Sequence, residues 1–93
     1  MLQELTPAQC RMARGALGWS RIRLARESNL TAETLASFES RRARLHPNHL
    51  RALRDALCGE GVEFFLEPDG RVCVRFDDKP LEPENPGETK ASS

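Results

Sequence analysis

Residues 17–42 read LGWSRIRLARESNLTAETLASFESRR, and their pattern is the clearest indication of the fold. It holds two short runs of apolar residues at helical spacing, and each run follows a residue that suits a helix N-terminus, Ser20 and Thr31. Asn29 lies between the two runs, and asparagine tolerates the left-handed backbone conformation best after glycine. The pattern predicts a short helix, a tight break and a second helix over about 32–40, which is the spacing of a helix–turn–helix.

The same spacing predicts which side chains face the core. Trp19 precedes the cap of the first run and can pack on Leu24 as a hydrophobic staple. The residues expected to face inward are Ile22, Leu24, Ala25, Leu35 and Phe38.

Further helices are predicted on both sides of this stretch. Thr6 and Gln9 form a capping box at the start of a helix over about 6–17. A fourth helix is expected to begin at Pro47, with Asn48 as its cap, and two glycines bracket its end.

Beyond the fourth helix the apolar period changes from helical to alternating, which predicts a β-hairpin over 62–76. The segment Pro68-Asp69-Gly70 matches a three-residue hairpin loop with glycine in the left-handed position. The resulting register pairs 62 with 76, 64 with 74 and 66 with 72, which are all apolar, and sets Glu63 opposite Arg75 and Glu67 opposite Arg71.

These segments resemble the helix-turn-helix of phage-repressor and Cro-type (Xre-like) regulators, whose motif reads roughly LGLSQEELAxxxGVSxxTISxIExG. The resemblance covers about residues 5–76, because small members of that family also append a β-hairpin. The matching positions are Leu17, Gly18, Ser20, Leu24, Ala25, Leu30, Thr34, Leu35, Phe38 and Glu39. Three positions depart from the motif: Arg21 replaces a glutamine, Asn29 replaces the turn glycine, and Arg41 replaces the glycine after the glutamate.

The resemblance implies a mainly α fold, a roughly four-helix bundle with a C-terminal β-hairpin. It indicates a DNA-binding domain over 1–61 and a hairpin over 62–76 that is a candidate dimerisation element. The acidic tail over 77–93 has too few apolar residues to order itself, so we expect it to be disordered. The implied function is a sequence-specific DNA-binding transcriptional regulator, a repressor or autoregulator of a bacterial, phage or mobile-element operon. The alternative is a protein-interaction module of the same fold, such as an antitoxin or anti-activator, with a partner on its hairpin or tail.

The second helix of the motif is expected to lie in the major groove of an operator. Alanine methyl groups on it can meet thymine methyl groups, and Glu33 can accept a hydrogen bond from cytosine N4. Glu33 equally suits the positive end of its own helix dipole, so both readings stay open. The candidate base-reading residues are Thr31, Ala32, Glu33, Thr34, Ala36 and Ser37.

Arginines flank this helix pair and are candidates for phosphate contacts. Arg21 and Arg23 lie in the first turn of the helix capped by Ser20, where the positive end of the helix dipole disfavours cations. A DNA phosphate bound there would offset this unfavourable interaction. Three further arginines follow the second helix directly. The alternative for both groups is a solvated basic surface. The candidate phosphate-binding residues are Ser20, Arg21, Arg23, Arg41, Arg42 and Arg44.

Two further predictions concern structure and assembly. The resemblance implies that Arg14 and Glu39 form a buried ion pair between the first and third helices. The hairpin has open edges, and we expect it to support a homodimer, either by pairing of these edges or by burial of Phe65 on its outward face. The alternative is that Phe65 packs within the monomer.

Charge is distributed unevenly along the chain. The whole sequence has no net charge, with 14 basic and 14 acidic residues. Residues 1–58 contain ten arginines and five acidic residues, a net charge of +5, whereas residues 59–93 contain four basic and nine acidic residues, a net charge of −5. The basic part predicts a polyanionic partner such as double-stranded DNA.

Other classes of function are not favoured by the sequence. It contains no glycine-rich phosphate loop, no Ser-His-Asp set and no zinc spacing around His46 and His49. We therefore expect no enzyme activity, no cofactor and no bound metal. Three widely spaced cysteines and the lack of a leader or membrane-spanning stretch predict a cytoplasmic protein that does not contact the membrane.

Overall fold

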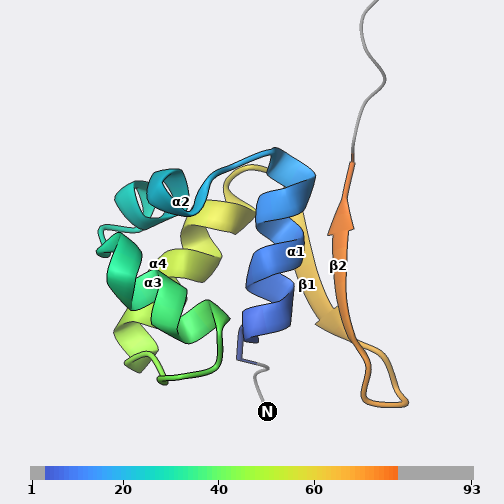
Figure 1. The fold of residues 1–93 in the computed structure, drawn as a ribbon. Helices are drawn as coiled ribbons and strands as arrows, with labels where there is room; N and C mark the ends of the chain where they lie inside the picture. Colours follow the sequence, from blue (N-terminus) through green and yellow to red (C-terminus); the bar gives the residue numbers. More distant parts are fainter. Residues whose placement is uncertain (1–3, 78–93) are drawn as a thin grey trace, which may run out of the picture.

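A computed structural model of the 93-residue chain describes residues 4–77. Four helices are followed by an antiparallel hairpin (Figure 1). The elements are α1 (Pro7–Leu17), α2 (Arg21–Glu27), α3 (Ala32–Glu39), α4 (Pro47–Cys58), β1 (Val62–Leu66) and β2 (Val72–Phe76). These elements confirm the predicted four helices and hairpin, whereas the predicted tail, apart from Asp77, lies outside the described residues. No helix within residues 4–77 has the length and apolar character needed to cross a bilayer.

The helix starts follow from local capping. Thr6 and Gln9 form the predicted capping box, in which the Gln9 amide donates to the Thr6 hydroxyl at 3.1 Å. Ser20 caps α2 through the Arg23 amide at 3.0 Å, and Thr31 caps α3. All three predicted caps are therefore confirmed.

The predicted cap of α4 is wrong. The N-cap is His46, whose Nδ1 accepts a hydrogen bond from the Asn48 amide at 3.0 Å. Pro47 occupies the first helical position, where its fixed φ suits a helix and its missing N–H is not needed. Because the helix begins at the proline, the cap falls one residue before it.

The breaks between helices use left-handed residues. Gly18 ends α1 with φ 69°, and Asn29 lies between α2 and α3 with φ 61°, as the sequence predicts. Arg41 also has a positive φ, 65°. It thus takes the conformation that the glycine of the resembled motif would supply, and α3 ends at Glu39.

The core lies between the four helices and extends to the hairpin. Leu24, Leu35, Leu53 and Leu57 are fully buried, and Trp19 is buried beside them. The prediction that Ile22 faces inward is wrong, because its side chain is 67% exposed. Ile22 lies two residues before the buried Leu24, which is about 200° around the helix axis.

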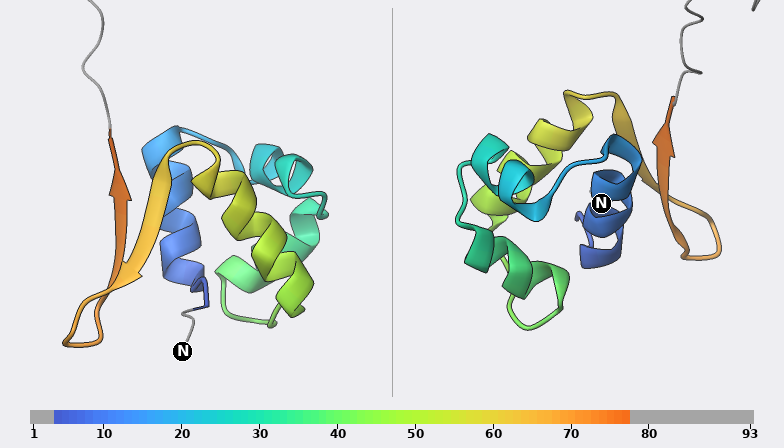
Figure 2. Two further views of the ribbon diagram at one scale, coloured as in Figure 1. Left: turned by 180° about the vertical axis from the view of Figure 1, so that it is seen from behind. Right: turned by 45° about the horizontal axis from the view of Figure 1, so that its top comes forward.

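The hairpin has the predicted register, from Val62 opposite Phe76 to Leu66 opposite Val72. Its loop ends in Gly70 with φ 93°, and Glu63 accepts a hydrogen bond from the Arg75 guanidinium at 2.6 Å. Figures 1 and 2 show α1 lying between the hairpin and α3. The hairpin and α3 are therefore on opposite sides of the molecule.

Gln9 ties the hairpin to α1. Its side chain is fully buried, and Nε2 donates to the carbonyl oxygens of Cys73 at 3.0 Å and Phe65 at 3.5 Å. The same residue completes the capping box, so one side chain fixes both the start of α1 and the position of the hairpin.

Candidate nucleic-acid interface

The turn between α2 and α3 is held by buried hydrogen bonds. The Ser28 hydroxyl donates to the Leu24 carbonyl at 2.7 Å, and the Leu30 amide donates to the Ala25 carbonyl at 2.7 Å. Because Ser28, Leu24 and Ala25 are buried, the turn is part of the core. This anchoring fixes the angle at which α3 is presented to solvent.

The outward face of α3 is polar. Glu33 and Ser40 are exposed and Ser37 is half-buried, and their spacing sets them along one side of the helix. Thr34 and Ala36 flank this line and are also half-buried. This arrangement brings together Glu33, Thr34, Ala36 and Ser37 of the predicted base-reading set.

Two members of the predicted base-reading set are placed differently. Ala32 packs in part against the core, which turns its methyl group away from the middle of the exposed face. The Thr31 hydroxyl accepts from the Thr34 amide at 3.1 Å and donates to the Thr34 hydroxyl at 2.7 Å. Because both of these contacts lie within the helix cap, Thr31 organises the start of α3.

The three arginines after α3 are exposed. Arg41, Arg42 and Arg44 take part in none of the ion pairs formed within residues 4–77. Their loop is closed by the Arg42 amide, which donates to the Ser37 carbonyl at 2.9 Å. These guanidinium groups are therefore available to an external anion.

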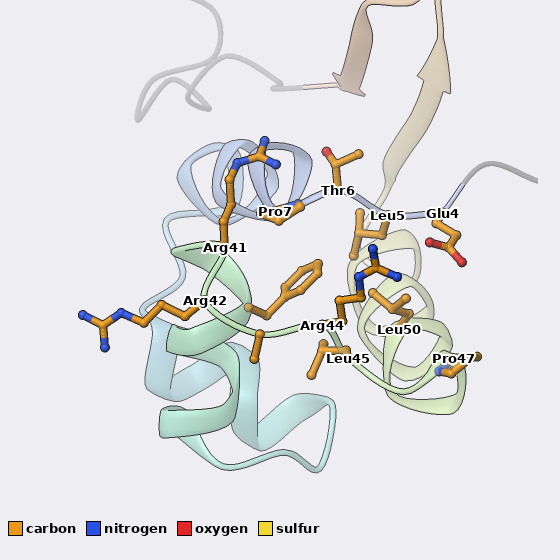
Figure 3. Close-up of a pocket in the computed structure, with 12 residues that line it drawn as sticks. Glu4, Leu5, Thr6, Pro7, Arg41, Arg42, Arg44, Leu45, Pro47 and Leu50 are labelled. Carbon is orange, nitrogen blue, oxygen red and sulfur yellow. The ribbon is translucent and has the colours of Figure 1, made fainter.

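A hollow of about 780 Å³ lies beside this loop. Its lining combines apolar side chains with charged ones: Leu5, Phe38, Leu45 and Leu50, the three arginines, and one acidic residue, Glu4. Figure 3 shows Arg42 pointing away from the other labelled residues. The positive charge thus spreads from the hollow to the adjoining surface.

The arginines at the start of α2 have partners inside the molecule. The Arg21 Nε donates to a Glu39 carboxylate oxygen at 3.1 Å, although the Arg21 side chain remains 47% exposed. The Arg23 guanidinium stacks over the Trp19 ring at 4.5 Å and lies 3.9 Å from the Glu27 carboxylate. Glu39 is thus an anionic partner for Arg21, and Glu27 is one for Arg23. The position of these arginines at the start of α2 is therefore no evidence for a bound phosphate there.

Glu39 is the centre of a buried polar network. Arg14 binds its carboxylate through two nitrogens, Nε at 2.8 Å and Nη2 at 2.9 Å, and thereby joins α1 to α3. The Cys10 thiol donates to the same carboxylate at 3.3 Å. The side chain of Glu39 is 1% exposed and that of Arg14 is 19% exposed. This geometry is the ion pair that the resemblance implies.

The network shifts the acid–base equilibria of its members. Burial alone would raise the pKa of the Glu39 carboxyl, but hydrogen bonds from Arg14, Arg21 and Cys10 outweigh it and lower that pKa. Burial, with the neighbouring Glu39 charge, raises the pKa of the Cys10 thiol. The thiol therefore stays protonated and acts as a donor to the carboxylate.

Three participants were missed in the sequence. Arg11 donates to the Glu39 carbonyl oxygen at the end of α3, and Cys10 belongs to the network rather than only to the apolar core. Ser40 continues the outward line of α3 and ends the helix. Only Ser40 had a signal in the sequence, its helical spacing from Glu33 and Ser37.

The remaining candidates are peripheral to this surface. Phe65 is 36% exposed on the hairpin, and Arg75 lies over its ring at 5.4 Å. The rings of His46 and His49 are 6.0 Å apart. In the described part of the chain, no group of three or more His, Cys, Asp or Glu side chains is arranged to hold a metal ion.

Comparison of the sequence with protein-family models gives no match, and comparison with curated proteins gives none either.

Proposed function

We propose that the protein is a sequence-specific double-stranded DNA-binding transcriptional regulator that acts at an operator. The observation that carries this proposal is the exposed arginine cluster of Arg41, Arg42 and Arg44 directly after the polar outward face of α3. A helix with one polar face toward solvent, followed by exposed arginines outside the ion pairs of residues 4–77, suits a major groove and its phosphates.

In the proposed complex, α2 and α3 act as a helix–turn–helix and α3 enters the major groove. Glu33 and Ser37 lie on its outward side and can accept from or donate to base edges, while the Ala36 methyl group can meet a thymine methyl. Side chains of this size make few bidentate contacts. Base readout is therefore modest, and phosphate contacts supply most of the affinity.

The buried Arg14–Glu39 pair is the positioning element of this site. It joins α1 to the last residue of α3, and Arg11 donates to the backbone carbonyl of the same residue. The end of α3 and the arginine loop after it are thus held by the side chains of Arg14, Arg11 and Cys10, which all lie on α1. A fixed loop lets Arg42 and its neighbours meet phosphates without further ordering.

The test begins with selection of binding sites from a random-sequence duplex library with the full chain. The affinity for the enriched duplex is then measured against salt for the wild type, Arg42→Ala and Arg75→Ala. We expect Arg42→Ala to lower the slope of log K against log salt by about 0.9 for each bound chain, because one phosphate contact is lost. Arg75→Ala is the control for loss of one positive charge, because this exposed arginine lies on the hairpin, on the other side of α1 from α3. Its oligomeric state is measured as well, because Arg75 lies on β2.

Two results would contradict the proposal. One is a selection that enriches no sequence. The other is an affinity that does not change with salt, or a slope that Arg42→Ala and Arg75→Ala lower equally.

A second candidate function is a protein-interaction module, such as an antitoxin or anti-activator. The observation in its favour is the exposed apolar surface of the hairpin, where Leu66 is 51% and Phe65 36% exposed. Its test is co-purification of a different protein with the full chain. A partner that is lost in Leu66→Asp, in a chain without salt-dependent DNA binding, would favour this candidate over the first.

A further inference from the structure

The outer edge of β2 is unprotected. The strand reads VCVRF, which is rich in β-forming residues and contains one charge and no proline. Within residues 4–77 its only strand neighbour is β1, and Figures 1 and 2 show no element beyond its outer edge. Proteins usually cover or charge such an edge, because its unpaired backbone groups bind other strands.

The ladder between β1 and β2 shows which backbone groups face this edge. Opposed residues in an antiparallel pair alternate between hydrogen-bonded and non-hydrogen-bonded. The Glu67 amide donates to the Arg71 carbonyl at 2.8 Å, so the next bonded pair is Phe65 with Cys73. The N–H and C=O groups that point away from β1 are those of Val72, Val74 and Phe76.

Apolar surface is also left uncovered at this edge. On β1, Val62 and Phe64 are 1% and 8% exposed, whereas Val74 and Phe76 opposite them are only half-buried. Met12 of α1 is 44% exposed, and it lies one turn after Gln9, which binds the Cys73 carbonyl. The inward side of β2 therefore has apolar contacts to offer another strand.

We propose that β2 pairs with β2 of a second copy of this chain, antiparallel about a two-fold axis at Val74. In this register the two Val74 residues face each other and Val72 faces Phe76 of the second copy. Arg71 faces Asp77 of the second copy, so two pairs of opposite charges close the ends of the interface. Arg71 and Asp77 are both exposed in the single chain.

Charge selects this register from its neighbours. Only the three residues with outward backbone groups can form hydrogen-bonded pairs, so the register can shift only in steps that keep these residues opposed. A shift in one direction sets Arg71 opposite Arg75 of the second copy, and a shift in the other sets the two Arg75 residues opposite each other. Like charges directly opposite destabilise a strand pair, whereas the register at Val74 avoids them.

This dimer rests on the proposed function for its biological role, because pairing of the two β2 strands would bring two copies of α3 to one DNA. Because α1 lies between α3 and the hairpin, the two α3 helices lie at opposite ends of the dimer. The operator is then expected to have two separated half-sites related by two-fold symmetry. The strand pairing itself needs no DNA, so it is tested independently.

The test is sedimentation equilibrium of the full chain without DNA. We expect a dimer, and we expect Asp77→Arg and Arg71→Asp each to raise its dissociation constant at least about tenfold through like-charge repulsion. Combining the two substitutions restores opposite charges and returns the constant to within about threefold of the wild type. Glu60→Arg is the matched control, because it changes the charge equally at an exposed turn between α4 and β1.

Two backbone and side-chain variants separate edge pairing from burial of Phe65. Val74→Pro removes an N–H that points to the open edge and leaves the β1–β2 bonds in place, so it gives a folded monomer. Phe65→Glu changes the outward face of the hairpin and leaves the dimer intact. A wild-type monomer at about 100 µM overturns the proposal. Three other results also overturn it. They are an unchanged dissociation constant in Asp77→Arg, a double variant whose dissociation constant stays as high as those of the single variants, and a folded Val74→Pro chain that still dimerises.

Discussion

At the scale of single residues, Glu39 organises the molecule. Its carboxylate is buried, and it receives hydrogen bonds from Arg14, Arg21 and Cys10, which lie on α1 and α2. A buried charge is costly unless it is fully paired, so the loss of one partner leaves a strong penalty. The contacts of Glu39 with Arg14 and Cys10 thus help to fix the orientation of α3 against α1.

Arg14→Ala is expected to lower the free energy of unfolding by about 3 kcal/mol, near the lower end for a broken buried pair. The lower end applies because the Arg14 side chain is 19% exposed, so water partly solvates its charge. Urea denaturation measures the change. The control combines Arg14→Met with Glu39→Gln. This double variant should lose less free energy of unfolding than the Arg14→Met and Glu39→Gln single variants lose together. Additive losses would contradict a coupled pair.

The same pair gives stability a dependence on pH. The pKa of Glu39 is lowered in the folded chain relative to its ordinary value of 4.5. Its stabilising contribution is therefore complete above that ordinary value, and it is lost as the pH falls through the lower pKa. Glu39→Gln should accordingly show a shallower loss of unfolding free energy with acid than the wild type, and equal slopes would contradict this assignment.

At the scale of elements, the helix ends were predicted well wherever one residue and its neighbours decide them. Thr6, Ser20 and Thr31 cap their helices because each cap bonds an amide within its own first turn. Contacts between elements were harder to predict from the sequence. The Gln9 bonds to the hairpin carbonyls depend on how α1 packs against the strands, which no local pattern reveals.

Arg41 is an exception to the rule that glycine occupies left-handed backbone positions at helix ends. Its φ of 65° is a left-handed conformation that costs a residue with a side chain roughly 1–2 kcal/mol relative to glycine. Glycine at this position would relieve the strain. If the Arg41 charge binds a DNA phosphate, the strain is offset by a contact outside the fold.

Arg41→Gly and Arg41→Ala separate strain from charge. Both remove the guanidinium, so both should lower the salt slope of DNA binding by about 0.9 for each bound chain. Only the glycine variant relieves the backbone, and it should melt several degrees above the alanine variant. Thermal unfolding and DNA titration measure the two effects. Equal melting temperatures would contradict the strain, and unchanged DNA slopes would contradict the phosphate contact.

At the scale of the whole molecule, charge follows the architecture. The net charge of +5 over residues 1–58 belongs to the helical part, whereas the net charge of −5 over 59–93 belongs to the hairpin and the residues after it. The arginine cluster after α3 and the hairpin lie on opposite sides of α1. The zero net charge of the chain therefore combines a basic helical part with an acidic part that follows it in the sequence. We expect the acidic part to weaken the attraction of the arginine cluster for DNA.

Truncation after Asp77 tests that expectation. It removes four acidic residues and two lysines, a net charge of −2, and keeps both charges of the proposed dimer interface. DNA binding should tighten by about two- to tenfold at low salt, and the gain should shrink as salt screens the repulsion. A full-length variant with Asp78→Asn, Glu82→Gln, Glu84→Gln and Glu88→Gln should show a similar gain if charge is the cause. Equal affinity of the truncated and full chains at every salt concentration would contradict a long-range role for these acidic residues.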